Sequence, residues 1–313
     1  MNGFRLDFSS QIATVVLEIV FVTMKARIIE TSSEHDEELF GTALHEVVRA
    51  DTSDPRLWLQ DAPVCRLLKT HHIAHVGVMQ ASHPFRVSRI NPNGTYMMAC
   101  IEGRGLVLVD GRWESLEEGQ ACLLPPFVMN RFKCLPRTPW KFCWVRYAES
   151  REQAPFISSS TPVMGAYEHK PLLHAILGLR AESAARSQPQ ALEAWVNLVH
   201  QYVMGFAQPQ HRDDRIVKLW QKVEKNLAHP WTLELMADLA HVSSEHLRRL
   251  CRRRLGRSPL QQLTFLRMQR AQQLLGSTND KIETIAHAVG YENAFTFSNS
   301  FKKWVGWRPS EHR

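Results

Sequence analysis

Arginine side chains gather on one side of a helix predicted over residues 244–255. Its apolar side consists of Leu247, Leu250, Cys251 and Leu255. On the helical wheel, the opposite side carries Glu245, Arg248, Arg249 and Arg252. Arginine donates two hydrogen bonds to guanine O6 and N7, and it also pairs with phosphate. This pattern favours a helix lying in the major groove of DNA over the alternative, a merely solvated charged face.

A second helix, predicted over residues 294–305, offers different groups. Its buried side consists of Ala294, Phe297, Phe301, Trp304 and Val305. The side facing away carries Phe295, Asn299, Lys302 and Lys303, flanked by Thr296 and Ser298. Asparagine pairs with adenine, and an exposed phenylalanine contacts a thymine methyl. With Ser243 and His246 at the start of the first helix, these residues predict an asymmetric site. The first helix reads a half containing guanine, and the second reads an A/T-leaning half more weakly.

Both helices belong to an internal repeat. Four positions of the first copy recur at an offset of 50, where Leu247, Cys251, Gly256 and Pro259 correspond to Phe297, Phe301, Gly306 and Pro309. Ahead of them, at an offset of 49, Leu233, Met236, Ala237 and Ala240 correspond to Ile282, Ile285, Ala286 and Val289. The one-residue difference falls between two short helices, where a turn absorbs it. We therefore expect helix-turn-helix units at about 232–255 and 281–305, with a plain helical bundle as the alternative.

The basic excess of the chain lies entirely in its C-terminal third. Residues 1–210 carry 20 Lys and Arg against 21 Asp and Glu, and residues 211–313 carry 18 against 10. A basic segment on a neutral body indicates a polyanionic partner, either nucleic acid or an anionic membrane surface. The membrane is disfavoured because the arginines lie on short, capped helices. The longest apolar run, Ile12 to Met24, is too short for a membrane span.

The segment from Leu233 to Arg313 resembles the DNA-binding domain of AraC-type transcriptional regulators. The second copy carries Ile282-Glu283-x-Ile285-Ala286-x-x-Val289-Gly290-Tyr291, Phe297-Ser298, Phe301-Lys302-Lys303 and Gly306-x-x-Pro309-Ser310. The first copy carries Leu247-x-Arg249-Leu250 and Leu255-Gly256-x-Ser258-Pro259, and the long helix between them carries Arg267, Ala271 and Leu274-Leu275. The resemblance implies recognition helices in successive major grooves of double-stranded DNA, about one turn apart. The chain departs from the family pattern at Cys251, Asn299 and His312.

Short apolar runs separated by turn residues occupy the region from Ile73 to Tyr147. The runs after the first, which begins at Val76, are Phe85–Ile90, Tyr96–Ile101, Leu106–Val109, Ala121–Leu124, Phe127–Phe132 and Trp140–Tyr147. Breaks at 91–94, 102–105 and 125–126 predict a β-sandwich or barrel, and Asp110-Gly111 predicts a hairpin. The segment also resembles the cupin-like ligand-sensing barrel of the same family. That resemblance rests on Ile101-Glu102-Gly103-Arg104-Gly105, Leu123-Leu124-Pro125-Pro126 and Trp140-x-Phe142-x-Trp144-Val145.

A small-molecule site is predicted inside this barrel. Such sites are mostly apolar with a few placed polar groups, and the expected lining is Arg89, Met98, Phe132 and Trp144. Tryptophan offers an apolar face to a sugar ring, and arginine donates to its hydroxyls. The resemblance implies a sugar or another small metabolite as the effector. The alternative is plain barrel core for Phe132 and Trp144 and a surface position for Arg89.

No metal, cofactor or catalytic residue is expected. Cupin enzymes hold a metal with clustered histidines and a glutamate. Here the strand at residues 96–100 has no histidine, and Asn130 lies where a later one would fall. His71, His72 and His75 do not share one face of a strand. A metal-dependent cupin enzyme with a DNA-binding tail and a ligand-independent DNA-binding protein remain the alternatives to a regulator.

We therefore expect an α+β protein with two domains, a cupin-like barrel with a helical dimerisation segment and an all-α domain with two helix-turn-helix units. Residues 1–72 form an N-terminal arm and lead-in, of which 1–23 precede an alternative start at Met24. The barrel covers 73–165, the linker 207–212 and the DNA-binding domain 213–313, and the resemblance implies that the helices within 166–206 serve dimerisation. A homodimer is implied by the resemblance, and RNA polymerase is a further expected partner. Six scattered cysteines outside any CxxC pair fit a reducing cytoplasm.

Overall fold

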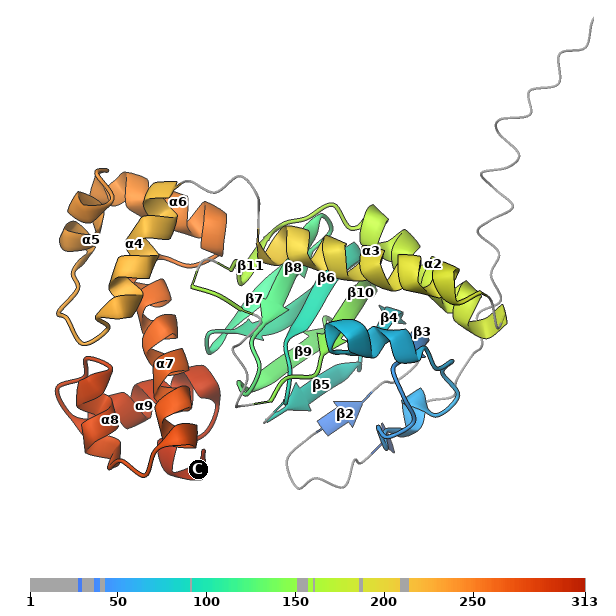
Figure 1. The fold of residues 1–313 in the computed structure, drawn as a ribbon, viewed down its shortest axis with the longest axis horizontal. Coiled ribbons are helices and arrows are strands. Elements are labelled where there is room, and N and C mark those ends of the chain that lie inside the picture. Colours follow the sequence, from blue (N-terminus) through green and yellow to red (C-terminus); the bar gives the residue numbers. More distant parts are fainter. Residues whose placement is uncertain are drawn as a thin grey trace, which may run out of the picture.

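The computed structural model describes residues 28–29, 37–39, 43–90, 92–150, 157–159, 161–185, 188–208 and 214–312. A curled β-sheet with two covering helices is followed by a separate group of helices (Figure 1). This is the two-domain α+β architecture that the sequence predicts. The apolar run from Ile12 to Met24 and the alternative start at Met24 lie outside the described residues. In the described part, no helix combines the length and the apolarity needed to cross a membrane.

The barrel is built on one branched sheet. Its strands are β1 (Ile28–Ile29), β2 (Glu37–Leu39), β3 (Leu44–Arg49), β4 (Ile73–Ala81), β5 (Arg86–Arg89), β6 (Tyr96–Val109), β7 (Arg112–Glu117), β8 (Gln120–Leu124), β9 (Asn130–Cys134), β10 (Trp140–Tyr147) and β11 (Met164–Ala166). They follow the order β1-β2-β5-β9-β6-β10-β4-β3, while β7 and β8 also pair with β6, and β11 pairs with β8. The short helices η1 (Leu57–Leu59) and η2 (Arg66–His71) connect β3 to β4.

Strand β6 runs through a stretch where the sequence predicts a break between two strands. The predicted break at residues 102–105 is wrong, because β6 continues through Gly103 and Gly105. The N-terminal part of β6 pairs with β8 and the C-terminal part with β7 and β9. Gly103 has a φ of +73°, and a Cβ there would meet the carbonyl oxygen of Pro139 at 2.1 Å. The glycines therefore let one strand bend between two sets of partners instead of ending it.

The predicted hairpin at Asp110-Gly111 is confirmed. Val109 pairs with Arg112 across a two-residue loop, and both loop residues have positive φ, 51° and 73°. This is the turn type that the Asp-Gly pair favours. Strands β1, β2, β3, β7 and β11 were not expected from the sequence, and the run beginning at Phe127 becomes a strand only at Asn130.

Two helices cover the outer face of the sheet, α2 (Lys170–Ala185) and α3 (Pro189–Ala207) (Figure 1). Side chains alternate along β10, so Cys143 and Val145 belong to the core shared with these helices. Phe142 and Trp144 point the other way, into the aromatic core inside the barrel. The barrel therefore buries both faces of its central strands.

The C-terminal domain contains six α-helices among its described residues. They are α4 (Asp214–Lys225), α5 (Leu233–Leu239), α6 (Ser244–Leu255), α7 (Pro259–Ser277), α8 (Ile282–Ala288) and α9 (Ala294–Val305), followed by the short η3 (Pro309–Glu311). Helix α7 runs between the pair α5–α6 and the pair α8–α9 (Figure 1). Its start is fixed by a capping box, in which the Ser258 and Gln261 side chains each bond the other's backbone N–H.

Candidate functional site

Helix α6 presents the predicted charged face to solvent. Ser243 caps the helix by accepting a hydrogen bond from the backbone N–H of His246, and Gly256 ends it in the left-handed region. The four residues of the predicted apolar stripe, Leu247, Leu250, Cys251 and Leu255, are all buried. Across the helix, the exposed side chains are Ser243, Glu245, Arg248, Arg249 and Arg252, and His246 is half-buried. The structure therefore brings these predicted contacts together on one accessible surface.

Two short-range contacts orient arginines on that surface. Arg248 Nη1 lies 3.3 Å from Glu245 Oε2, and Arg249 Nη2 lies 2.9 Å from His246 Nδ1. The first contact is an exposed ion pair and the second a hydrogen bond to an imidazole; exposed ion pairs are weak, and each contact engages only one guanidinium nitrogen. A guanidinium has five N–H donors, so donors remain on each arginine for a phosphate or a guanine edge.

Helix α9 is the equivalent helix of the second copy. Phe297, Phe301 and Val305 are buried, while Phe295 remains 77% exposed. The predicted polar contacts Thr296, Asn299, Lys302 and Lys303 are also exposed, and Ser298 is half-buried. The helix is capped by Asn293, whose side chain accepts from the backbone N–H of Thr296. Asparagine one residue before a helix start was available as a sequence cue for this cap.

The barrel contacts both of these helices at their C-terminal ends. The backbone N–H of Val163 donates to the carbonyl of Leu255 at 2.9 Å, and that of Met129 donates to the carbonyl of Val305 at 2.8 Å. Leu255 and Val305 are equivalent positions of the repeat. The glycines that follow them also face the barrel, since added Cβ atoms would meet Met164 at Gly256 and Met129 at Gly306. Sequence reasoning did not identify this interface.

A buried ion pair joins the two domains beside these contacts. Arg257 is 2% exposed and donates from Nε and Nη2 to the two carboxylate oxygens of Asp110, at 2.6 and 2.9 Å. Asp110 is the first residue of the β6–β7 turn. The guanidinium also stacks on Phe265, 3.7 Å from the ring centre. Two bonds from side-chain amides add to this contact, Gln262 Nε2 to the Ser159 carbonyl and Gln272 Nε2 to the Phe127 carbonyl.

The predicted small-molecule residues all lie inside the barrel. Arg89, Met98, Phe132 and Trp144 are buried, so the surface position considered for Arg89 is wrong. The Arg89 guanidinium lies over the rings of Tyr96 and Phe132, 5.3 and 5.7 Å from their centres. Cations over aromatic faces are stabilised by the ring quadrupole.

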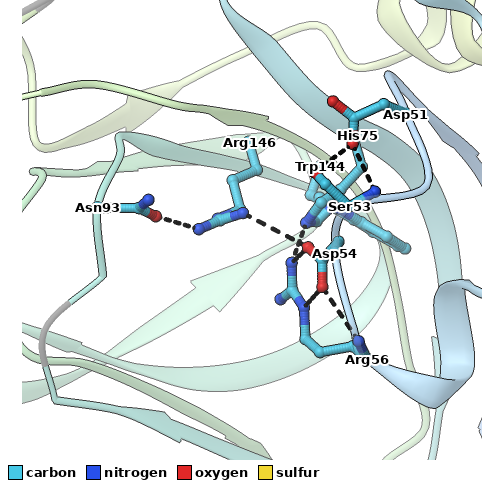
Figure 2. Close-up of polar contacts among 8 residues, drawn as sticks. All are labelled: Asp51, Ser53, Asp54, Arg56, His75, Asn93, Trp144 and Arg146. Carbon is cyan, nitrogen blue, oxygen red and sulfur yellow. Dashed lines mark hydrogen bonds and ion pairs between the residues drawn. The ribbon is translucent and has the colours of Figure 1, made fainter.

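A polar cluster that the sequence did not reveal lies at one end of the barrel interior (Figure 2). Arg56 donates to the carboxylate of Asp54, and Arg146 Nη1 lies 3.9 Å from the same carboxylate. Arg56 Nη2 also lies 3.1 Å from His75 Nε2, while the Trp144 indole N–H donates to His75 Nδ1 at 2.9 Å. Asp54 and Arg56 are neighbours, but His75, Trp144 and Arg146 lie on strands β4 and β10, so no local sequence pattern predicts the cluster.

Burial and positive charge shift the pKa values in this cluster. Burial holds the pKa of His75 well below its usual value, and the charges of Arg56, Arg146 and Arg89 lower it further. Burial, with the charges of Arg56 and Arg89, lowers the pKa of Arg146 to about 10. Burial favours the protonated form of Asp54, but the hydrogen bonds and charge of Arg56 prevail and lower its pKa. His75 is therefore neutral at physiological pH, beside three guanidinium groups.

The upstream histidines do not converge. His71 stacks on His200 with ring centres 4.0 Å apart and contacts Asn197, whereas His75 points into the barrel. His72 ends helix η2 with a positive φ. Among the residues that the structure describes, no three His, Cys, Asp or Glu side chains form a group able to hold a metal ion.

Comparison with known proteins adds independent information. Residues 236–313 match the family model described as a helix-turn-helix domain. The MmsAB operon regulatory protein of Pseudomonas aeruginosa is 26% identical over 282 residues, which are 83% of this chain and 88% of that protein. The raffinose operon transcriptional regulatory protein RafR of Pediococcus pentosaceus is 26% identical over 63% of this chain and 76% of its own length. A solved AraC-type transcriptional regulator from Chromobacterium violaceum is 29% identical, with a TM-score of 0.31, over 32% of this chain and 89% of that chain.

Proposed function

We propose that this chain, whose residues 236–313 match a helix-turn-helix domain, is an AraC-type transcriptional regulator that binds double-stranded DNA through α6 and α9 and responds to a small molecule held inside the barrel. The observation that carries the DNA-binding assignment is the repeated arrangement of the two helices. Each has a buried apolar stripe and an exposed polar face, and each ends in a left-handed glycine, although Ala294 and Trp304 of the α9 stripe are only half-buried.

The two faces are proposed to read different bases. On α6, Arg248, Arg249 and Arg252 contact guanine or phosphate, supported by Ser243, Glu245 and His246. On α9, Asn299 reads adenine and Phe295 contacts a thymine methyl, with Thr296, Ser298, Lys302 and Lys303 around them. Lys303 also lies against the β6–β7 turn, since a Cβ at Gly111 would meet its backbone oxygen at 2.3 Å. This contact supports coupling between DNA binding and the barrel.

The proposed effector acts through the barrel. A ligand shifts the equilibrium between two conformations of a regulator only if it binds them with different affinities. The barrel contacts at Leu255 and Val305 give a physical route for that difference, because they join the ligand domain to both recognition helices. One named relative regulates a raffinose operon, so a sugar is one effector class to test. Arg89, Met98, Phe132 and Trp144 are the proposed lining.

Assembly and location complete the proposal. Helices α2 and α3, within the proposed segment 166–206, form the interface of a homodimer. The proposed linker at 207–212, of which residues 209–212 lie outside the described residues, joins this segment to the DNA-binding domain. The protein works in the cytoplasm, with RNA polymerase as a further partner, and catalyses no reaction. A metal-dependent cupin enzyme and a ligand-independent DNA-binding protein are the competing functions.

DNA binding by the full-length protein tests the proposal. Fluorescence anisotropy across a salt series should compare random duplexes with a pool selected for tight binding. Strong preference for the selected duplexes, with affinity falling as salt rises, is the expected result. Equal, weak binding to every duplex would contradict sequence-specific regulation. Metal analysis of the purified protein, combined with a thermal-shift screen of metabolites, distinguishes the two competing functions.

A further inference from the structure

A cleft of about 280 Å³ lies between the barrel and the helical domain, on the side of the barrel formed by β7 and β11 (Figure 1). Its barrel wall comes from the β6–β7 hairpin, β8 and β11, and its opposite wall comes from the end of α6 and the first turn of α7. This volume is at the lower end of the range for small-molecule sites. The cleft is separate from the barrel interior, because none of Arg89, Met98, Phe132 and Trp144 lines it.

Three charged side chains line this cleft and have no partner in the described part of the chain. They are Arg112 and Glu114 of β7 and Arg252 of α6, and all three are exposed, so the cleft opens to solvent. None of these side chains makes a hydrogen bond or an ion pair with a described residue. Asp110 also lines the cleft, but both of its carboxylate oxygens accept from Arg257. The cleft therefore holds two guanidinium groups and one carboxylate that are available to a ligand.

Two glutamine side chains add hydrogen-bond donors to the same cleft. Gln120 Oε1 accepts from the backbone N–H of Glu117 at 3.1 Å, and Gln261 Oε1 accepts from the backbone N–H of Ser258 at 2.8 Å. Because these contacts use the amide oxygens, each glutamine keeps its NH₂ group for another partner. With the two guanidinium groups, these amides make donors more numerous than acceptors in the cleft. A ligand rich in acceptor oxygens therefore complements it.

The helix ends at the cleft do not oppose a negative charge. The C-terminal end of α6 carries a partial negative charge, but the carbonyl of Leu255 already accepts from the backbone N–H of Val163. The first turn of α7, which carries a partial positive charge, reaches the cleft through Gln261. These two contributions have opposite signs, so the side chains decide which charge the cleft prefers.

We propose that this cleft binds the phosphate group of a small phosphorylated molecule. Arg112 and Arg252 donate charge-assisted hydrogen bonds to the phosphate from opposite walls. The amides of Gln120 and Gln261 donate to its remaining oxygens. A phosphate offers three oxygens in different directions, whereas a carboxylate offers two in one plane and would leave some of these donors without a partner.

Occupation of the cleft lowers the affinity of the protein for DNA. Arg252 belongs to the proposed DNA-contacting face of α6, and a guanidinium that holds the ligand phosphate is lost to DNA. The ligand also bridges the two domains, because each domain supplies one wall of the cleft. Binding of the phosphorylated molecule does not depend on the proposed function, whereas this effect on DNA rests on it.

Pairs of phosphorylated and unphosphorylated probes test the ligand class on the full-length protein. Glycerol phosphate and glucose phosphate are compared with glycerol and glucose by calorimetry and thermal shift, alongside inorganic phosphate and acetate. We expect a phosphorylated probe to bind and to raise the melting temperature while its parent compound does not. Equally tight binding of inorganic phosphate would support the phosphate site and assign no role to the rest of the ligand. Equal binding of a probe and its parent, tighter binding of acetate, or no binding at millimolar concentration would overturn the proposal.

Variants at exposed positions locate the site. Arg112→Gln and Arg252→Gln should each weaken binding of the phosphorylated probe by about tenfold, since each removes one charge-assisted contact. Glu114→Gln should strengthen binding, because it removes a carboxylate that repels the phosphate. Arg253→Gln is the control, because Arg253 is the exposed neighbour of Arg252 on α6 but does not line the cleft. Unchanged affinity in both cleft arginine variants, or an equal loss in the control, would overturn the assignment.

DNA affinity, measured in the same samples, separates this inference from the proposed function. A probe that binds and lowers DNA affinity supports the cleft and its effect, and Arg112→Gln should then remove that effect. A probe that binds without changing DNA affinity supports the cleft and contradicts competition for Arg252. Absence of sequence-specific DNA binding would contradict the proposed function, while calorimetry would still decide whether the cleft binds phosphate.

Discussion

Arg257 and Asp110 form a two-bond ion pair between the domains, 147 residues apart in sequence and largely out of water. Asp110 occupies a two-residue turn and Arg257 directly follows the glycine that ends α6. The pair therefore connects the tip of a barrel hairpin to the C-terminal end of α6. A two-residue turn and a capped helix end fix the backbone on either side of the pair.

Removing one partner of this pair should destabilise the protein. Asp110→Ala leaves the Arg257 guanidinium buried without its carboxylate, which costs about 3 kcal/mol. Urea titration of the variant should show the loss, and DNA affinity should change with it because the domains are released. Glu114→Ala on the neighbouring strand, where the side chain is exposed, is the control. Equal stability of the two variants would contradict a structural role for the pair.

Arg249→Ala should weaken binding to the selected DNA site and relax the preference at one base pair. A lost bidentate contact to guanine costs about 1–3 kcal/mol. The measurement is anisotropy on duplexes substituted base by base. Arg270→Ala removes an exposed arginine from α7, away from the proposed surface, and should leave the preference intact. The same loss at every sequence would assign Arg249 to phosphate instead.

Asn299→Ala should affect only the A/T-leaning half of the site. Asparagine pairs with adenine through two hydrogen bonds, so its loss should abolish discrimination there while the guanine-containing half keeps its own. Base-by-base substitution of both halves with this variant measures the effect. Guanine-dependent losses in both halves would contradict the asymmetric site.

Stability should fall between about pH 6.5 and pH 4 through His200. Burial lowers the pKa of His200 to about 4, and the positive charge of neighbouring His71 contributes. The unfolded chain takes up a proton on His200 in that range while the folded protein does not, so protonation favours unfolding as pH falls. Melting temperatures from pH 7.5 to pH 4.5 measure it. His200→Asn should reduce the dependence, leaving the part due to His75, whose pKa is also lowered by burial, whereas His174→Asn, an exposed histidine on α2, should not change it.

All six cysteines should resist thiol reagents in the folded protein. Each is buried, and burial raises the pKa values of Cys122, Cys143 and Cys251 to about 12. Thiolates are the reactive species, so labelling by a disulfide reagent should proceed only as the chain unfolds. Rapid labelling of one cysteine under native conditions would refute this.

Local chemistry explains which elements were predictable. Ser243, Ser258 and Gly256 mark helix ends with side-chain or backbone chemistry that acts within a few residues, and Asp110-Gly111 does the same for a turn. The course of β6 was not predictable, because Gly103 bends a strand whose pairing partners come from elsewhere. The exposed faces of α6 and α9 follow from helical periodicity alone.

The inner cluster and the domain interface depend on contacts between distant segments. Asp54 and Arg146 are more than 90 residues apart in the chain, and each alone resembles an ordinary surface residue. Arg89 lies on a short strand whose neighbours decide which face is inside. Only the closed barrel places these charges together, so sequence periodicity could suggest Arg89 but not its companions.

The equivalent barrel contacts at Leu255 and Val305 bear on the geometry of the operator. The duplex completes a turn about every 10.5 base pairs, so two helices read one face of it only when their separation matches that repeat. Because the barrel contacts the ends of both helices, it fixes the distance between them along the duplex. Inserting one base pair between the half-sites should then be penalised more in the intact protein than in a variant whose barrel contacts are broken.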